Sequence, residues 1–223
     1  MHPPFARGDT YLPAAGLHAL TGIYDTVIAL TMRERLFRGE LVDRVLQERA
    51  AGPALDILDI GAGTGTLAIM LATRGAHVYA VDGDPEVLML ARAKPGSERV
   101  RWYEACVDAL PLEDASVDRV VCSLVLHHLP DHVKHAALGE SLRVLRYGGR
   151  LHIADWGPPR DPAMRLAFRL LQAVDGRERT QSHADGLIPR FVADAGFGAV
   201  RIGERLRTMW GQLELISAVK GSG

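Results

Sequence analysis

The sequence contains very little cysteine, with Cys106 and Cys122 as its two thiols among 223 residues. Two cysteines are too few for a disulfide scaffold or a cysteine-rich metal site. We therefore expect both to be reduced, each within a strand, in a cytoplasmic protein. The chain also lacks the apolar segment of a secretory signal and any apolar run of membrane-spanning length. We expect no integral membrane association.

Neither sign of charge is in excess, since 26 basic residues face 27 acidic ones and the formal net charge is −1. Such a balance offers no general attraction to a polyanion, so nucleic acid is not an expected partner. The length suits one compact unit that buries a core without disulfides or metals. Helix-like spacing of apolar residues predicts an N-terminal helical cap over residues 1–50, followed by one domain over residues 51–223. The monomer and the homodimer both stay open as oligomeric states.

One stretch organises the rest of the chain: residues 57–65, Ile-Leu-Asp-Ile-Gly-Ala-Gly-Thr-Gly. An apolar run stops at three glycines spaced every second residue and resumes after Thr66, which predicts a strand, a tight turn and a helix. Glycine permits positive φ and lets a ligand approach bare backbone, while the new helix directs free N–H groups at it. This is the geometry of a nucleotide site. The alternative is a tight connection with no ligand.

Strands and helices are expected to alternate after this turn. Strands are expected at residues 55–60, 76–82, 100–104, 118–126 and 150–156, with two more at 199–206 and 212–219. Asp84 before Pro85 is a typical helix start, and another helix is expected from Pro130 to the glycines at 148 and 149. The alternation predicts an α/β fold with a doubly wound, mostly parallel sheet that binds ligands at the carboxyl ends of its strands. The short link between the last two strands predicts a terminal antiparallel hairpin, which brings the total to seven strands.

A glycine-rich turn of this kind usually binds one of two cofactors, a dinucleotide or S-adenosylmethionine. The spacing of the glycines begins to distinguish them. The dinucleotide fingerprint is G-x-G-x-x-G, whereas this chain has G-x-G-x-G. Its third glycine, Gly65, comes one position early, and Thr66 stands where the fingerprint has its last glycine. Asp82, at the end of the second expected strand, does not discriminate, because a carboxylate there can accept the ribose hydroxyls of either cofactor.

Several motifs then follow in a fixed order: Leu58–Gly65, Val81–Arg92, Val107–Leu112, Val121–Leu129 and Leu145–Leu151. In this order they resemble the class I S-adenosylmethionine-dependent methyltransferases. The His127-His128-Leu129 element and the Tyr24-Asp25 pair narrow the resemblance to the branch that includes the quinone-biosynthesis C-methyltransferases. The resemblance implies a Rossmann-like sheet of order 3-2-1-4-5-7-6. It also implies transfer of a methyl group from S-adenosylmethionine to a small-molecule acceptor, with S-adenosylhomocysteine as the product.

The same resemblance implies roles for individual residues. Asp59 would orient the glycine loop or the cofactor's ammonium group, Asp82 would hold the ribose, and Asp108 would face the adenine amine. Further cofactor contacts are implied in the glycine turn, at small residues after two strands, and beside the methyl sulfonium at the end of the fourth strand: Gly61, Ala62, Gly63, Gly65, Gly83, Ala109, Ser123 and Leu124. Each also has a purely structural interpretation, as a loop brace, a turn residue, a small packing residue or a strand terminus.

His127 and His128, just past the fourth expected strand, are the candidate catalytic residues. The unperturbed histidine pKa of about 6.5 suits a general base. A base is needed only if the acceptor must lose a proton. Asp155, at the end of the fifth strand, is expected nearby as a carboxylate partner. The alternative role of the two histidines is packing and hydrogen bonding.

Two further expectations concern the surroundings of the site. Tyr24 in the helical cap could place an aromatic face over the sulfonium, although its spacing with Leu20 and Ile28 equally fits a core position. No metal is expected, because Pro130 breaks the helix that would bring His128, His132 and His135 onto one face.

Two other functions compete with methyl transfer. A catalytically idle S-adenosylmethionine-binding module would keep the motifs but have no turnover. An NAD(P)-dependent oxidoreductase is disfavoured by the glycine spacing and by the terminal hairpin. Binding of S-adenosylhomocysteine without binding of NAD would separate the methyltransferase from the oxidoreductase, and turnover would separate it from the idle module.

Overall fold

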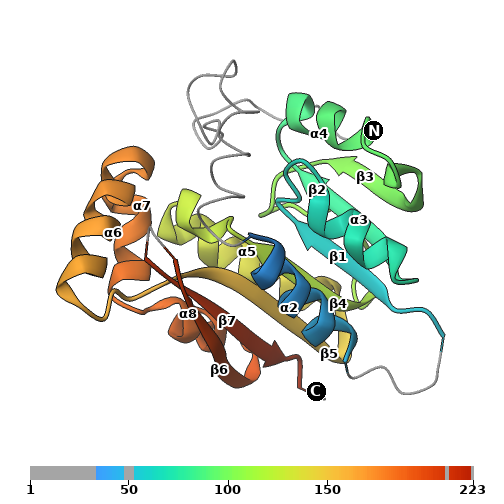
Figure 1. The fold of residues 1–223 in the computed structure, drawn as a ribbon. Coiled ribbons are helices and arrows are strands. Elements are labelled where there is room, and N and C mark those ends of the chain that lie inside the picture. The colour runs from blue at the N-terminus through green and yellow to red at the C-terminus, as the bar shows by residue number, and fades with distance from the viewer. Residues whose placement is uncertain (1–33, 48–52, 209–210, 222–223) are drawn as a thin grey trace.

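The computed structural model describes residues 34–47, 53–208 and 211–221. Seven strands form one sheet in the order β3-β2-β1-β4-β5-β7-β6, which confirms the expected fold and strand order (Figure 1). The strands from β1 to β5 pair in parallel, whereas β7 is antiparallel to both β5 and β6. Their bounds are β1 (Asp56–Ile60), β2 (His77–Asp82), β3 (Val100–Glu104), β4 (Val117–Ser123), β5 (Leu145–Gly157), β6 (Gly198–Arg207) and β7 (Gln212–Val219).

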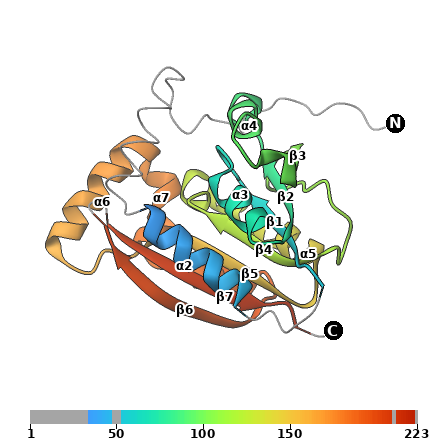
Figure 2. The same ribbon diagram turned by 45° about the vertical axis from the view of Figure 1, so that its right-hand side comes forward.

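Helices cover both faces of this sheet. Those in the described part of the chain are α2 (Glu34–Leu46), α3 (Thr66–Thr73), α4 (Pro85–Arg92), η2 (Ser97–Arg99), η3 (Leu126–His128), α5 (Asp131–Val144), α6 (Pro162–Asp175), α7 (Arg177–Ala184) and α8 (Ile188–Asp194). Figures 1 and 2 show α2 and α3 on one face and α5 and α8 on the other, with α6 and α7 beyond one end of the central strands. None of these helices is long and apolar enough to cross a membrane.

The core has two layers because both faces of the parallel strands are buried. Successive strand residues point to opposite faces. Ile57 and Val121 therefore join the apolar cluster under α2 and α3, while Leu58 and Val120 join the cluster under α5 and α8. The near-continuous apolar runs in the sequence follow directly from this two-sided burial.

Helix α2 lies against the sheet rather than apart from it. Phe37, Leu41 and Val45 are buried in the same cluster as Ile57 of β1 and Leu71 of α3. The remainder of the expected helical cap, including Tyr24, lies outside the described residues. The expected boundary at residue 50 stays a prediction.

The expected helix start at Asp84 is confirmed, since its carboxylate accepts from Glu86 N at 2.9 Å and Pro85 opens α4. The expected end of β4 at Leu126 is wrong. The strand stops at Ser123 because Leu124 takes a φ of +58° and the chain then turns into η3. Cys106, expected in a strand, is exposed in the loop after β3, whereas Cys122 is buried in β4.

The expected boundary between α5 and β5 is also wrong. The helix ends at Val144 and the strand begins at Leu145, not at Arg150. Leu145 pairs with Val117 of β4, while Gly148 N donates to Lys220 O and Lys220 N donates to Gly149 O, both at 2.9 Å, so β4 and Lys220 together hold this segment in the sheet. Apolar spacing alone does not report such a long-range pairing.

Candidate active site

The glycine turn between β1 and α3 serves two purposes. All three glycines have positive φ, +63° at Gly61, +54° at Gly63 and +77° at Gly65. A Cβ at Gly61 would lie 2.4 Å from Val125 Cγ2, and one at Gly65 would lie 2.3 Å from Trp102 Cη2, whereas one at Gly63 would meet nothing within 4 Å. Gly61 and Gly65 are therefore required by packing, and Gly63 leaves bare backbone open to a ligand.

Asp82, at the carboxyl end of β2, is tied to that open position. Its Oδ2 accepts from Gly63 N at 2.7 Å and its Oδ1 accepts from Asp84 N at 3.0 Å. The side chain is half-buried, and burial raises the pKa of its carboxyl despite these two hydrogen bonds. A hydrogen-bonding carboxylate thus stands beside the exposed backbone of the turn.

Asp59 lies deeper, in the middle of the sheet. It is 2% exposed, and its Oδ2 has no hydrogen-bond partner among the described residues. Burial raises the pKa of Asp59 to about 7, against the lowering effect of Arg38 and of a hydrogen bond from the Ala68 backbone. Because Ala68 belongs to the first turns of α3, Asp59 braces the helix that follows the glycines.

The other expected cofactor contacts lie at the same edge of the sheet. Ile60 pairs with Val81 of β2 and with Cys122 of β4. Gly61 and Ala62, which follow Ile60, therefore lie beside Gly83 and the end of β4. Asp108 and Ala109 are exposed in the loop after β3. At the end of β4, Ser123 Oγ is buried without a hydrogen-bond partner in the described structure, and Leu124 has left-handed backbone. A bulky residue at positive φ is strained, as residues at functional sites often are.

A buried histidine and carboxylate pair follows β4. His127 Nδ1 lies 2.7 Å from Asp155 Oδ1, with side chains 5% and 1% exposed. Asp155 also accepts from Leu126 N at 2.9 Å and from Trp156 N at 2.8 Å. Burial alone would raise the pKa of Asp155, but His127 and His183 outweigh it and hold that pKa well below its ordinary value. Since an ionised carboxylate only accepts, Nδ1 of His127 is the donor and its Nε2 faces away.

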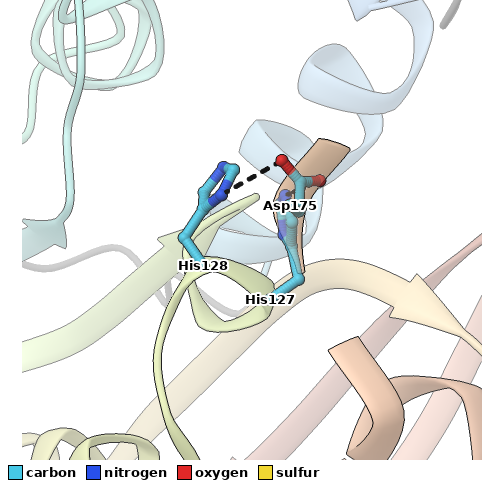
Figure 3. Close-up of side chains that lie close together, drawn as sticks. All are labelled: His127, His128 and Asp175. Atoms are coloured by element: carbon cyan, nitrogen blue, oxygen red, sulfur yellow. Dashed lines mark ion pairs between the residues drawn. The ribbon is translucent and has the colours of Figure 1, made fainter. Parts of the chain in front are cut away.

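A second carboxylate, Asp175, faces both histidines (Figure 3). It ends α6 with a side chain only 3% exposed, and its two oxygens lie 3.9 Å from His127 Nε2 and 3.7 Å from His128 Nδ1. Burial, followed by the influence of His127, lowers the pKa of His128 to about 3, so this ring is neutral at physiological pH. The prediction from sequence that Asp155 lies near His127 and His128 is confirmed, whereas Asp175 was not predicted.

A signal for Asp175 exists in the sequence. It shares one face of α6 with Met164, Phe168 and Leu171, all of which are buried or packed on the core. A carboxylate on the apolar face of an amphipathic helix needs a partner and so marks a candidate site. His183, on α7, was also left outside the expected site, yet its Nε2 lies 3.7 Å from Asp155 Oδ1.

Helix α7 is attached to α5 by a buried lysine. Lys134 has a fully buried side chain, and its Nζ donates to Asp131 Oδ1 at 2.7 Å, to Arg179 O at 2.6 Å and to Ser182 Oγ at 2.6 Å. These bonds secure the segment that carries His183. By contrast, His132 and His135 are exposed on α5.

Comparison with known proteins identifies the kind of domain. A family model described as a methyltransferase domain matches residues 57–149. The chain is similar to a demethylmenaquinone methyltransferase of Thermus thermophilus, 37% identical over 150 residues, which are 60% of this chain and 67% of that protein. It is similar to another of Clavibacter sepedonicus, 38% identical over 130 residues, covering 57% and 52%. The matches thus span between a half and two thirds of these relatives.

A solved structure resembles the fold at lower sequence identity. The magnesium protoporphyrin IX methyltransferase of Synechocystis, solved with bound S-adenosylmethionine, superposes with a TM-score of 0.64 at 21% identity. The superposition covers 84% of this chain and 80% of that one. It supports the fold and its strand order.

Proposed function

This chain belongs to the class I S-adenosylmethionine-dependent methyltransferases, and we propose that it transfers a methyl group from S-adenosylmethionine to a small organic molecule. The observation that carries this proposal is the Asp82 carboxylate, which accepts from Gly63 N at 2.7 Å, at a glycine whose added Cβ would meet nothing within 4 Å in the described part of the chain. A carboxylate next to open backbone suits the ribose hydroxyls and the adjoining part of the cofactor. The residues present therefore fit the group that the family uses.

The residues proposed to hold the cofactor surround this point. Asp82 and Gly83 would bind the ribose, and Asp108 and Ala109 would border the adenine. The methionine portion and the methyl group would lie against the glycine turn and the nearest strand ends. The residues there are Asp59, Gly61, Ala62, Gly63, Gly65, Ser123 and Leu124. These assignments, the role of Tyr24 and the cytoplasmic location stay predictions.

The chemistry asks little of the protein beyond alignment. The bound sulfonium supplies an activated methyl group and a good leaving group. The chain must align the acceptor with it and exclude water. If the acceptor is a hydroxyl or an acidic carbon, its proton must also be removed. We propose that His127 or His128 performs this step, because His127 is oriented by the ionised Asp155 and His128 is partly exposed. His128 is a weaker base than its unperturbed pKa suggested, since burial lowers that pKa to about 3.

Calorimetry tests the cofactor half of the proposal. The full chain should bind S-adenosylhomocysteine at one site and should not bind NAD; the reverse preference would refute the proposal. The acceptor half requires incubation with methyl-labelled S-adenosylmethionine and fractionated small-molecule extract. Label transferred to a small molecule would support an enzyme, whereas binding without transfer to any fraction would favour the idle module.

A further inference from the structure

We propose that His127, His128 and Asp175 bind one divalent transition-metal ion. The three side chains come from η3 and from the end of α6, and the atoms that could coordinate an ion, one from each residue, all lie within 4.8 Å of one another. Two imidazoles and one carboxylate are the donors of many catalytic zinc sites, which keep a further position open for water or substrate. Magnesium and calcium prefer oxygen donors alone, so they are not the expected ions.

The distances leave room for an ion between the donors. His128 Nδ1 lies 3.7 Å from Asp175 Oδ1, and His127 Nε2 lies 3.9 Å from Asp175 Oδ2. Donors bound to one tetrahedral zinc at about 2.0–2.2 Å lie roughly 3.4 Å apart. The two carboxylate distances exceed this value by a few tenths of an ångström, and no two of the coordinating atoms are more than 4.8 Å apart, so side-chain movement of about an ångström would complete the site. Both distances are too long for a hydrogen bond, so no proton bridges these atoms.

The orientation of His127 supports the same conclusion. Its Nδ1 donates to Asp155 Oδ1 at 2.7 Å, which leaves a lone pair on the Nε2 that faces Asp175. Metal-binding histidines usually donate their other N–H to a carboxylate in this way, and that bond fixes the ring and raises the basicity of the ligand. Asp155 is thus a positioning residue for the proposed ligand.

Asp175 supplies an independent observation. Its side chain is only 3% exposed, and its Oδ2 has no hydrogen-bond partner in the part of the chain that the structure describes. A buried carboxylate oxygen without a donor is costly, and here it faces the lone pair of His127. A bound cation would satisfy both acceptors at once.

This proposal reverses the expectation of no metal. That expectation considered whether His132, His135 and His183 form a metal spacing with His127 and His128, and it weighed no carboxylate ligand; His132 and His135 lie exposed on α5. The third ligand comes from Asp175 instead, which is 47 positions after His128 and could not be found by local spacing. In turnover, the ion would replace His127 and His128 as the means of removing the acceptor's proton, because their ring nitrogens would be bound to it. Its open position would take the acceptor's oxygen and lower the pKa of the acceptor, a role that rests on the proposed function.

The test uses the full chain after treatment with EDTA and dialysis. Calorimetric titration with zinc chloride at neutral pH should show one ion per chain with a Kd of about 1 µM or tighter, within the range that two imidazoles and a carboxylate provide. Cobalt(II) should bind at the same site and give visible absorption bands, whose intensity reports its coordination number. Absence of stoichiometric zinc binding would overturn the proposal.

Two variants locate the ion. Asp175→Asn should weaken zinc binding by about 100-fold and abolish the cobalt bands, because it removes an anionic ligand while keeping the shape. The matched control is Asp185→Asn, which alters an exposed carboxylate that accepts from Gln181 Nε2 in α7; this variant should bind zinc as the native chain does. Native affinity in Asp175→Asn would overturn the assignment. If that variant does not fold, His128→Gln takes its place with the same expected loss.

Binding of S-adenosylhomocysteine by the same proteins separates this proposal from the proposed function. Cofactor binding without zinc binding would reject the metal site and leave the methyltransferase proposal intact. Zinc binding without cofactor binding would reject the proposed function and leave the metal site intact.

Discussion

The indole ring of Trp102 fills the space into which a side chain at Gly65 would project. A Cβ at residue 65 would lie 2.3 Å from Cη2 of that ring, and the indole Nε1 is held by a 3.0 Å hydrogen bond to Ser97 O. Gly65, the third glycine of the motif, is therefore required because the turn packs directly against Trp102 of β3. Only Gly63, in the middle of the turn, is free of such a contact.

Gly65→Ala should destabilise the protein more than Gly75→Ala. Both positions have positive φ, +77° and +88°, so alanine incurs a backbone penalty of about 1–2 kcal/mol at each. Only at Gly65 does the new methyl group also collide with a ring, since nothing lies within 4 Å of a Cβ at Gly75. Thermal unfolding should show a clearly lower Tm for Gly65→Ala. Equal Tm values for the two variants would contradict the packing role.

Asp82→Ala should weaken binding of S-adenosylhomocysteine by about 100-fold or more, because hydrogen bonds to a charged group contribute roughly 1.5–3 kcal/mol each. It also releases Gly63 N, which now donates to this carboxylate at 2.7 Å. Glu104→Ala is the control, since Glu104 ends β3 directly beside Asp82 in the sheet. Calorimetry should find native affinity for the control; unchanged affinity in Asp82→Ala would refute the ribose assignment.

Asp59→Asn should stabilise the cofactor-free protein increasingly as the pH rises. Burial raises the pKa of Asp59 from 3.8 to about 7, so the folded state holds a proton that the unfolded state has lost. The contribution of Asp59 to the free energy of unfolding therefore falls as the pH rises from about 4 to about 7, and it stays constant above that range. The Tm difference between Asp59→Asn and the native chain should be small at pH 4 and should reach several degrees at pH 8. A difference that does not change with pH would argue against the raised pKa.

Asp155→Ala should lower the free energy of unfolding by about 3 kcal/mol or more, because each buried donor left without a partner costs about 1–3 kcal/mol. Three donors lose their acceptor: His127 Nδ1, Leu126 N and Trp156 N. Urea unfolding measures the loss. Asp185→Ala, at an exposed carboxylate, should change stability by no more than about 0.5 kcal/mol.

Lys134→Met should loosen α7 selectively. The substitution removes three hydrogen bonds, of which those to Arg179 O and Ser182 Oγ join α5 to α7. Hydrogen exchange followed by mass spectrometry should show faster exchange in Arg177–Ala184. Lys220→Met is the control, because Lys220 bonds Leu145 O at the other end of the sheet. Native protection of α7 in Lys134→Met would show that this helix is held by other contacts.

Much of the fold could be predicted because local signals and tertiary packing agree there. Asp84 before Pro85 both caps α4 and stands where the sheet needs a helix to start. The prediction fails at Leu145, whose apolar side chain continues the helical spacing of α5. Pairing with Val117 of β4 places it in β5 instead, and the spacing of apolar residues carries no record of that long-range pairing.

The site was predictable to the extent that its residues follow strand ends. His127 lies in η3 just after β4, and Asp155 lies near the end of the neighbouring parallel strand β5. The pairing of Ser123 with Ala154 brings the two side chains to 2.7 Å. Asp175 was not found because it depends on how α6 docks, which residue spacing does not describe. Its place on the buried face of that helix, after Phe168, is the one feature that pointed to it.

Asp175 and His183 both belong to the segment between β5 and α8, whereas the proposed cofactor contacts lie before it. Residues 158–186 therefore complete the histidine cluster from outside the part of the chain that carries the proposed cofactor contacts. We expect exchange of this segment with that of a relative to change the histidine cluster and to leave cofactor binding in place. A graft of this segment should retain Lys134, since its bonds to Arg179 O and Ser182 Oγ join α7 to α5.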